Sequence, residues 1–263
     1  MNDAQIDLKK LDAPRGLGDR IRTWWDGLSR PAQWGVGVVG FVLLAVLPVV
    51  KPPLIATTAT DFGATMAQFA MIALIAIGLN VVVGQAGMLD LGYVGFYAVG
   101  AYVVALLTSP ASPVWNSTDH GVFTGPWGWL ACVPLAIVIT GITGLVLGTP
   151  TLRVRGDYLA IVTLGFGEIV RLIADNLTEV TNGPAGLQGV LFPELGISDR
   201  HPEGVFAQSN NSGALNYGVW WYWLGLALVV IVLLVIGNLE RSRVGRSWVA
   251  IREDEDAAEI MGV

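Results

Sequence analysis

Long apolar runs alternate with short polar stretches along most of the chain. A helix needs about 20 apolar residues to cross the ~30 Å hydrocarbon core of a bilayer, because each residue adds ~1.5 Å. Six runs come close to this length and predict six membrane-spanning helices. They cover residues 34–50, 62–83, 89–107, 127–147, 158–174 and 219–237. The predicted fold class is therefore all-α, a polytopic transmembrane helix bundle.

The composition agrees with a membrane protein. The chain has 263 residues, of which 53% are hydrophobic and only 14% are charged. A soluble domain carries about 25% charged residues, so lipid must solvate part of this apolar surface. The single cysteine, Cys132, lies in an apolar run and has no partner for a disulfide within the chain. We expect a buried, unreactive thiol.

Basic residues are distributed unevenly between the polar stretches, and this predicts the orientation. If the N-terminus is cytoplasmic, 12 of the 15 basic residues fall in cytoplasmic segments, as the positive-inside rule requires. Only Lys51 and Arg200 then lie outside, and Arg171 falls within the fifth span. The prediction divides the chain into three parts: a cytoplasmic N-terminal segment (1–33), a transmembrane domain (34–237) and a cytoplasmic loop (238–263).

Polar and glycine residues interrupt the apolar pattern between the second and third spans, at residues 78–92. One interpretation is a broken segment that lines a translocation route, because irregular backbone at membrane depth is tolerated only beside protein or a water-filled path. The other is an ordinary cytoplasmic hairpin, in which Asn80, Gln85 and Asp90 are merely interfacial. The sequence leaves both open.

The predicted fifth span carries two charged side chains, Glu168 and Arg171. Glu168 would lie ~15 Å along the helix from Tyr158, near the bilayer midplane. A lone charge there costs on the order of 3 kcal/mol, and Arg171 on the same face offers an ion pair. The pair is either a structural staple between helices or part of the substrate path. The candidates for the path are Asn80, Gln85, Tyr93, Thr163, Glu168 and Arg171.

The last 22 residues, 242–263, have the pattern of a short amphipathic helix, an acidic cluster and a second short helix closed by Gly262. Trp248 and Ile251 share one face of the first helix, since they are three residues apart. Composition alone favours a solvated linker here.

Signatures of catalysis are missing from the sequence. It contains no nucleotide-binding P-loop, no G-x-S-x-G and no His/Glu metal motif. We therefore expect a transport component rather than an enzyme, with no metal site. If the transport is driven by ATP, the ATPase must be another chain.

Three blocks of the sequence resemble a known family when taken in order. Asp256-Ala257-Ala258-x-x-x-Gly262 is similar to the EAA-x(3)-G loop of ABC importer permeases, with Asp in place of the first Glu. Residues 245–255, and also residues 151–169 and 78–100, resemble the LivM-type permeases of branched-chain amino acid importers. The resemblance runs from about residue 73 to the end.

This resemblance implies an ABC importer permease fold in a bacterial cell membrane. It implies a second homologous permease subunit, two cytoplasmic ATPase subunits that bind ATP and Mg²⁺, and an extracytoplasmic binding protein that delivers leucine, isoleucine or valine. This chain would bind no cofactor and no nucleic acid. Members of the family continue through further membrane helices, so we expect a truncated sequence. The residues implied in coupling to the ATPase are Gly245, Arg246, Trp248, Ala250, Ile251, Arg252, Asp254, Asp256, Ala257, Ala258 and Gly262.

Two other functions stay open at this point. Related permeases import urea or short amides, and a secondary transporter or channel would need no ATPase. A membrane-anchored enzyme has least support, because no catalytic constellation is present.

Overall fold

Helices make up all the regular structure that the computed structural model describes. The described residues are 23–25, 27–52, 61–113, 128–151, 157–197, 203–211, 213 and 215–262. The chain forms two compact units, Met1–Pro52 and Pro53–Val263, and each is described by itself. The all-α prediction is confirmed.

The first unit contains α3 (Arg30–Val50), which matches the first predicted span. Pro31 stands in the first turn, where a missing N–H costs no hydrogen bond. Lys51 ends the helix in the left-handed conformation, with its N–H bonded to the Leu47 carbonyl. The side chains of α3 are largely exposed within this unit, as expected of a helix that lipid or another protein covers.

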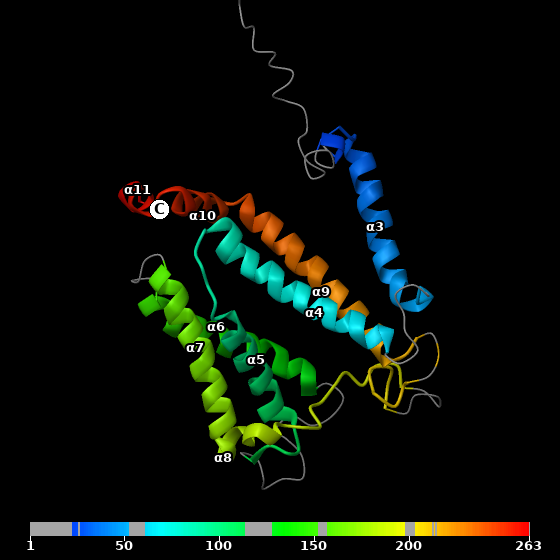
Figure 1. The fold of residues 1–263 in the computed structure, drawn as a ribbon. Helices are drawn as coiled ribbons and strands as arrows, with labels where there is room; N and C mark the ends of the chain where they lie inside the picture. The colour runs from blue at the N-terminus through cyan, green and yellow to red at the C-terminus, as the bar shows by residue number, and fades with distance from the viewer. Residues whose placement is uncertain are drawn as a thin grey trace, which may run out of the picture. The chain divides into compact units, whose positions relative to one another are not determined.

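The second unit contains the other predicted spans (Figure 1). α4 (Phe62–Asn80) continues as a π-helix, η1 (Val81–Gln85). The later helices are α5 (Tyr93–Thr108), α6 (Gly128–Thr151), α7 (Asp157–Asn176), α8 (Thr178–Thr181), η3 (Gly183–Ala185), α9 (Tyr217–Glu240), α10 (Arg243–Glu253) and α11 (Glu255–Ile260). Cys132 is buried in α6, as predicted.

Four of the described helices are long and apolar enough to cross a membrane: α3, α4 with η1, α6 and α9. The other two predicted spans, α5 and α7, are not in this group, each for its own reason. α5 has only 16 residues because the third span, predicted to start at residue 89, becomes helical at Tyr93. α7 has 20 residues but carries charged side chains along its length.

The helices of the second unit alternate in direction. α4 and α9 lie side by side and parallel (Figure 1), since Ala70 faces Gly225 near the middle and Gln85 reaches Glu240 at the end. α5 runs antiparallel to α6, with Gly100 against Thr140, and parallel to α7. Three long helices, α5, α6 and α7, lie between α4 and α9 along the chain. Because successive long helices alternate in direction, α9 runs in the same direction as α4, as the predicted spans require.

Small residues let α4 and α9 approach closely. An added methyl group on Gly218 would lie 2.6 Å from the backbone carbon of Gly63, and one on Gly225 would lie 2.9 Å from the Ala70 Cβ. At the start of the pair, the Asp61 carboxylate accepts hydrogen bonds from the Gly63 N–H and the Asn216 side chain. Packing through glycine is typical of helices in lipid, where close contact replaces hydrophobic burial.

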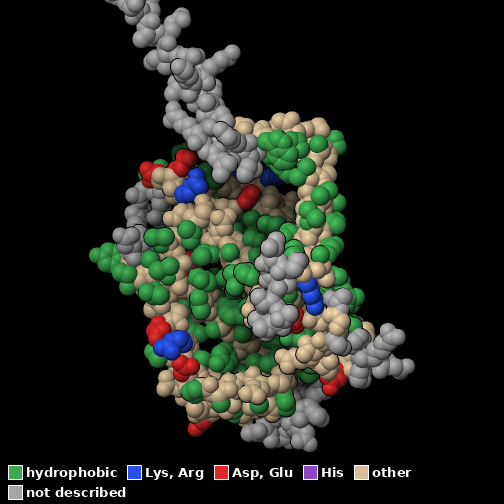
Figure 2. Space-filling model, turned by 45° about the vertical axis from the view of Figure 1, so that its right-hand side comes forward, with side chains coloured by type: hydrophobic (Ala, Val, Ile, Leu, Met, Phe, Trp, Pro, Cys, Tyr) green, Lys and Arg blue, Asp and Glu red, His purple; other side chains and the backbone are tan. Residues whose placement is uncertain are grey.

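The outward sides of these helices remain apolar and uncovered. Ile137 and Leu145 of α6, Ile161 of α7 and Leu234 of α9 are 60% exposed or more. Figure 2 shows hydrophobic side chains over most of the helical surface, with acidic and basic side chains mainly towards the helix ends. Such a surface suits lipid or a partner subunit, so the chain is a multi-pass membrane protein.

Candidate functional site

The interruption between α4 and α5 is an irregular segment held by side chains. The chain leaves the π-helix at Gln85, and Gly87 adopts a φ of +73°, which favours glycine. Asp90 accepts a hydrogen bond from the Gly92 N–H at 2.7 Å, and the Leu91 N–H donates to the Thr163 hydroxyl at 3.0 Å. Polar side chains thus satisfy backbone groups that no helix pairs, as low-dielectric surroundings require.

The position of Thr163 indicates how deep this segment lies. Thr163 is six residues beyond Asp157, the first residue of α7, which places it ~9 Å along that helix. Its hydroxyl contacts Leu91, and its backbone lies against Gly92. α5 therefore begins alongside the second turn of α7 rather than level with its end. This geometry favours the broken segment over the ordinary hairpin.

A cavity of about 940 Å³ opens beside the broken segment. Val82 and Met88 line it from the segment, Phe96 from α5, and further apolar side chains from α6 and α7. Asp90 and Thr163 are the polar side chains that reach it, and Asp90 also lines a second cavity of about 510 Å³ between α4 and α5. The large cavity is therefore an apolar space with one carboxylate and one hydroxyl at its edge.

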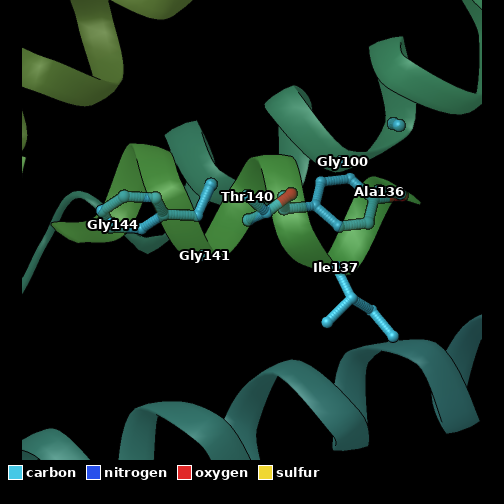
Figure 3. A pocket seen from close by; sticks show the side chains of 9 residues that line it. Gly100, Ala136, Ile137, Thr140, Gly141 and Gly144 are labelled. Carbon is cyan, nitrogen blue, oxygen red and sulfur yellow. The ribbon is translucent and has the colours of Figure 1, made fainter. Parts of the chain in front are cut away.

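A third hollow of about 590 Å³ lies between α5 and α6 (Figure 3). Gly100, Ala136, Gly141 and Gly144 line it, and Thr140 lies between the two helices. The hollow exists because small residues face one another: Gly141 has no neighbour within 4 Å of the place of a side chain.

The structure separates the predicted path residues. Thr163 lines the large cavity, and Tyr93 lines the one between α4 and α5. The Gln85 amide instead donates to the Glu240 carboxylate at the end of α9. Asn80 is exposed, and its side chain lies against Gly84.

Glu168 and Arg171 form the predicted ion pair, but within α7. Arg171 donates to both Glu168 oxygens, at 2.6 and 3.0 Å, and to Asp175 at 3.0 Å. The Arg171 side chain is 60% exposed and that of Glu168 is 53% exposed. Among the described residues the pair joins no second helix, so the staple interpretation finds no support within this unit. Asp175 extends the predicted pair to three charges, and its spacing of four residues from Arg171 is a visible signal in the sequence.

The C-terminal stretch forms two short helices, as its pattern predicts, rather than an irregular linker. The Ser242 hydroxyl caps α10 by accepting from the Val244 N–H, and the Asp254 carboxylate caps α11 by accepting from the Ala257 N–H. Gly262 follows α11 with a φ of +79°.

The predicted coupling residues divide by burial. Gly245 and Ala258 are buried, and Trp248, Ala250 and Ile251 are half-buried. Arg246, Arg252, Asp254 and Ala257 are exposed. Asp256 belongs to α11, and its side chain lies outside the described part of the chain.

Arg252 connects the C-terminal stretch to the broken segment. Its guanidinium Nη1 donates to the Gly84 carbonyl at 3.0 Å. A methyl group on Gly87 would lie 2.6 Å from the Arg252 Cγ, so the stem of this side chain packs directly on that glycine. The sequence does not predict this contact, because no local pattern indicates which of two segments 168 residues apart will touch.

Metal chemistry has no candidate site in the described ranges. No group of three or more His, Cys, Asp or Glu side chains there could hold an ion.

Comparison with known proteins gives one consistent result. The family described as "Branched-chain amino acid transport system / permease component" matches residues 62–263. The chain is 42% identical over 228 residues to the high-affinity branched-chain amino acid transport system permease protein LivM of Salmonella typhimurium, which covers 84% of this chain and 50% of that protein. The same protein of Escherichia coli is 42% identical over 230 residues, with the same coverage.

A more distant relative is the probable branched-chain amino acid transport permease protein LivM of Methanocaldococcus jannaschii. It is 26% identical over 215 residues, which cover 74% of this chain and 57% of the relative. The chain therefore spans about half the length of the relatives that it matches. No solved structure matches it significantly.

Proposed function

Because this chain belongs to the family of permease components of branched-chain amino acid transport systems, we propose that it forms part of the membrane pathway of an ATP-driven importer for leucine, isoleucine and valine. The observation that carries the proposal is the family match over residues 62–263. That range includes the large cavity, the broken segment and the C-terminal helices.

The large cavity is the candidate route for substrate. Its apolar lining suits a branched aliphatic side chain, because the transfer of an aliphatic group from water to an apolar site is favourable, whereas that of a polar group is not. The Asp90 carboxylate at its edge offers a counter-charge for an α-ammonium group, and Thr163 offers a hydroxyl beside it. Urea and short amides carry neither an aliphatic branch nor an ammonium group, so they would use this lining poorly.

Coupling to ATP would occur through the C-terminal helices. The permease must have two states, and the ATPase must bind one of them better when it holds ATP. Exposed Arg246, Asp254 and Ala257 are available for an ATPase surface. The proposal therefore includes two cytoplasmic ATPase subunits that carry ATP and Mg²⁺, with no cofactor on this chain.

A second permease subunit and an extracytoplasmic binding protein complete the proposed assembly. The uncovered apolar sides of α6 and α7 support a membrane-embedded partner, since lipid alone does not suit the exposed charges of α7. The N-terminus would be cytoplasmic, in the cell membrane of a bacterium.

Uptake measurements test this function. Cells that express the chain together with its partner subunits should accumulate labelled leucine, and unlabelled isoleucine and valine should compete while urea should not. Depletion of ATP should abolish leucine uptake, and dissipation of ion gradients at constant ATP should leave leucine uptake unchanged. Competition by urea would favour the amide permease. Uptake that follows the ion gradient would favour the secondary transporter.

A further inference from the structure

α10 contacts both the broken segment and the end of α9. Arg252 donates to the Gly84 carbonyl, and its stem packs on Gly87. Between these two glycines, Gln85 donates to Glu240, the last residue of α9. Gly245 of α10 packs in turn on the backbone of Glu240. The end of α9, the start of α10 and residues 84–87 therefore form one contact cluster.

We propose that Arg252 is a positioning residue that transmits the movement of α10 to the broken segment, and that it is not a contact for the ATPase. This inference rests on the proposed function, because it assigns a part of the coupling between ATPase and cavity. It differs from the implication of family resemblance, which counts Arg252 with the residues that face the ATPase.

The geometry explains why an arginine suits this role. Gly84 lies in the last turn of the π-helix, where carbonyl groups lack a following N–H donor on the same helix. A guanidinium supplies a charge-assisted hydrogen bond with a fixed, planar direction, whereas a lysine ammonium would not fix that direction. The packing of the Arg252 stem on Gly87 adds a second, apolar point of contact. Two points of contact resist both sliding and rotation of α10 against the segment.

The broken segment continues from the Arg252 contact to the large cavity within a few residues. Met88 directly follows Gly87, and Asp90 comes two residues later. Both side chains line the large cavity, and the Leu91 N–H donates a hydrogen bond to Thr163, which also lines it. A displacement of α10 that carries Gly84 and Gly87 would therefore move Met88 and Asp90 relative to Thr163.

The test compares two arginines of α10 in the assembled importer. Arg252→Met keeps an apolar stem but removes the donors, and Arg246→Met changes an exposed arginine on the same helix. We expect Arg252→Met to co-purify normally with the ATPase subunits but to lose stimulation of ATP hydrolysis by the leucine-loaded binding protein. Leucine uptake should fall about tenfold, within the range of typical coupling free energies. Arg246→Met should weaken co-purification instead.

Two further variants keep the inference falsifiable if Arg252→Met is not inserted in the membrane. Arg252→Lys should keep stimulation only partly. Gly87→Ala should uncouple stimulation from binding, because its methyl group would displace the Arg252 stem and because alanine is strained at the φ of +73°. Loss of co-purification in an inserted Arg252→Met, or stimulation within twofold of wild type in that variant, would overturn it. Where Arg252→Met is not inserted, stimulation within twofold of wild type in Gly87→Ala would overturn it. If the wild-type assembly itself takes up no leucine, the proposed function fails rather than this inference.

Discussion

At the scale of single residues, glycines determine how closely neighbouring helices pack in this protein. Gly218 and Gly225 bring α9 against α4, Gly245 folds α10 back on the end of α9, and Gly87 leaves room for Arg252. Other glycines, such as Gly237 and Gly141, have no neighbour where a side chain would stand. The residue type alone therefore does not reveal which glycines are needed for close packing. Alanine substitutions can measure the difference in stability between the two groups.

Gly218→Ala should destabilise the chain, because its methyl group would collide with the backbone of Gly63 and Ala64, which cannot move aside as a side chain could. Overpacking of this kind costs about 1–3 kcal/mol. Thermal unfolding in detergent micelles would measure the loss. Gly237→Ala in the same helix is the matched control, since open space surrounds it. Equal melting temperatures for the two variants would contradict the close packing of α4 and α9.

The corner between α9 and α10 depends on one small residue in the same way. In Gly245→Ala the new methyl group would meet the backbone of Glu240, so the corner should open and α10 should leave the broken segment. Limited trypsin digestion should then cut faster after Arg241 and Arg243. Val244→Ala, next to it and exposed, should leave the rate unchanged. Unchanged digestion of Gly245→Ala would mean that α10 tolerates another path out of α9.

At the scale of elements, the interrupted helix is the feature with most consequence. The second predicted span is an α-helix that loosens into a π-helix, and the third starts late at Tyr93. Between them, backbone groups are paired by Asp90 and Thr163 instead of by helix. An irregular segment of this kind has fewer bonds to break than a helix, and it borders the large cavity.

Filling that cavity should block transport without loss of assembly. Val162→Trp places a large ring in the space between α6 and α7, so leucine uptake should fall at least about tenfold, which corresponds to ~1.4 kcal/mol. Its neighbour Ile161 is 65% exposed on the surface of α7, and Ile161→Trp is the matched control. The amount of protein in the membrane and its co-purification with partners would be measured for both. Normal uptake by Val162→Trp would exclude this cavity as the route.

At the scale of the whole molecule, the helices of the second unit expose both apolar and charged side chains. The helices of the second unit expose large aliphatic side chains, and α7 also exposes Glu168, Arg171 and Asp175 at their ion pairs. Lipid solvates the aliphatic side chains well, but contact of lipid with the charged side chains is energetically unfavourable. We therefore expect a protein neighbour, rather than lipid, at the charged face of α7.

The orientation in the membrane can be tested with single cysteines. After Cys132→Ser, a cysteine in place of Ser209 should react with an impermeant maleimide on intact cells, because the loop before α9 is expected outside. A cysteine in place of Glu253, at the end of α10, should react only after the cells are permeabilised. The reverse labelling would invert the predicted topology, while labelling of both positions on intact cells would contradict a crossing of the membrane by α9.

The sequence by itself determined the features that depend on neighbouring residues. Apolar runs of sufficient length located the spans, and Gly262 indicated where the last short helix ends, because hydrophobic periodicity and capping act over a few residues. Only the tertiary structure decided that α4 pairs with α9, that the Glu168 ion pair stays on one helix, and that Arg252 reaches Gly84. The contacts of α4 with α9 and of Arg252 with Gly84 depend on which surfaces fit across some 150 residues or more, and no local pattern carries that information. The surroundings of the Glu168 ion pair likewise depend on which helices pack against α7.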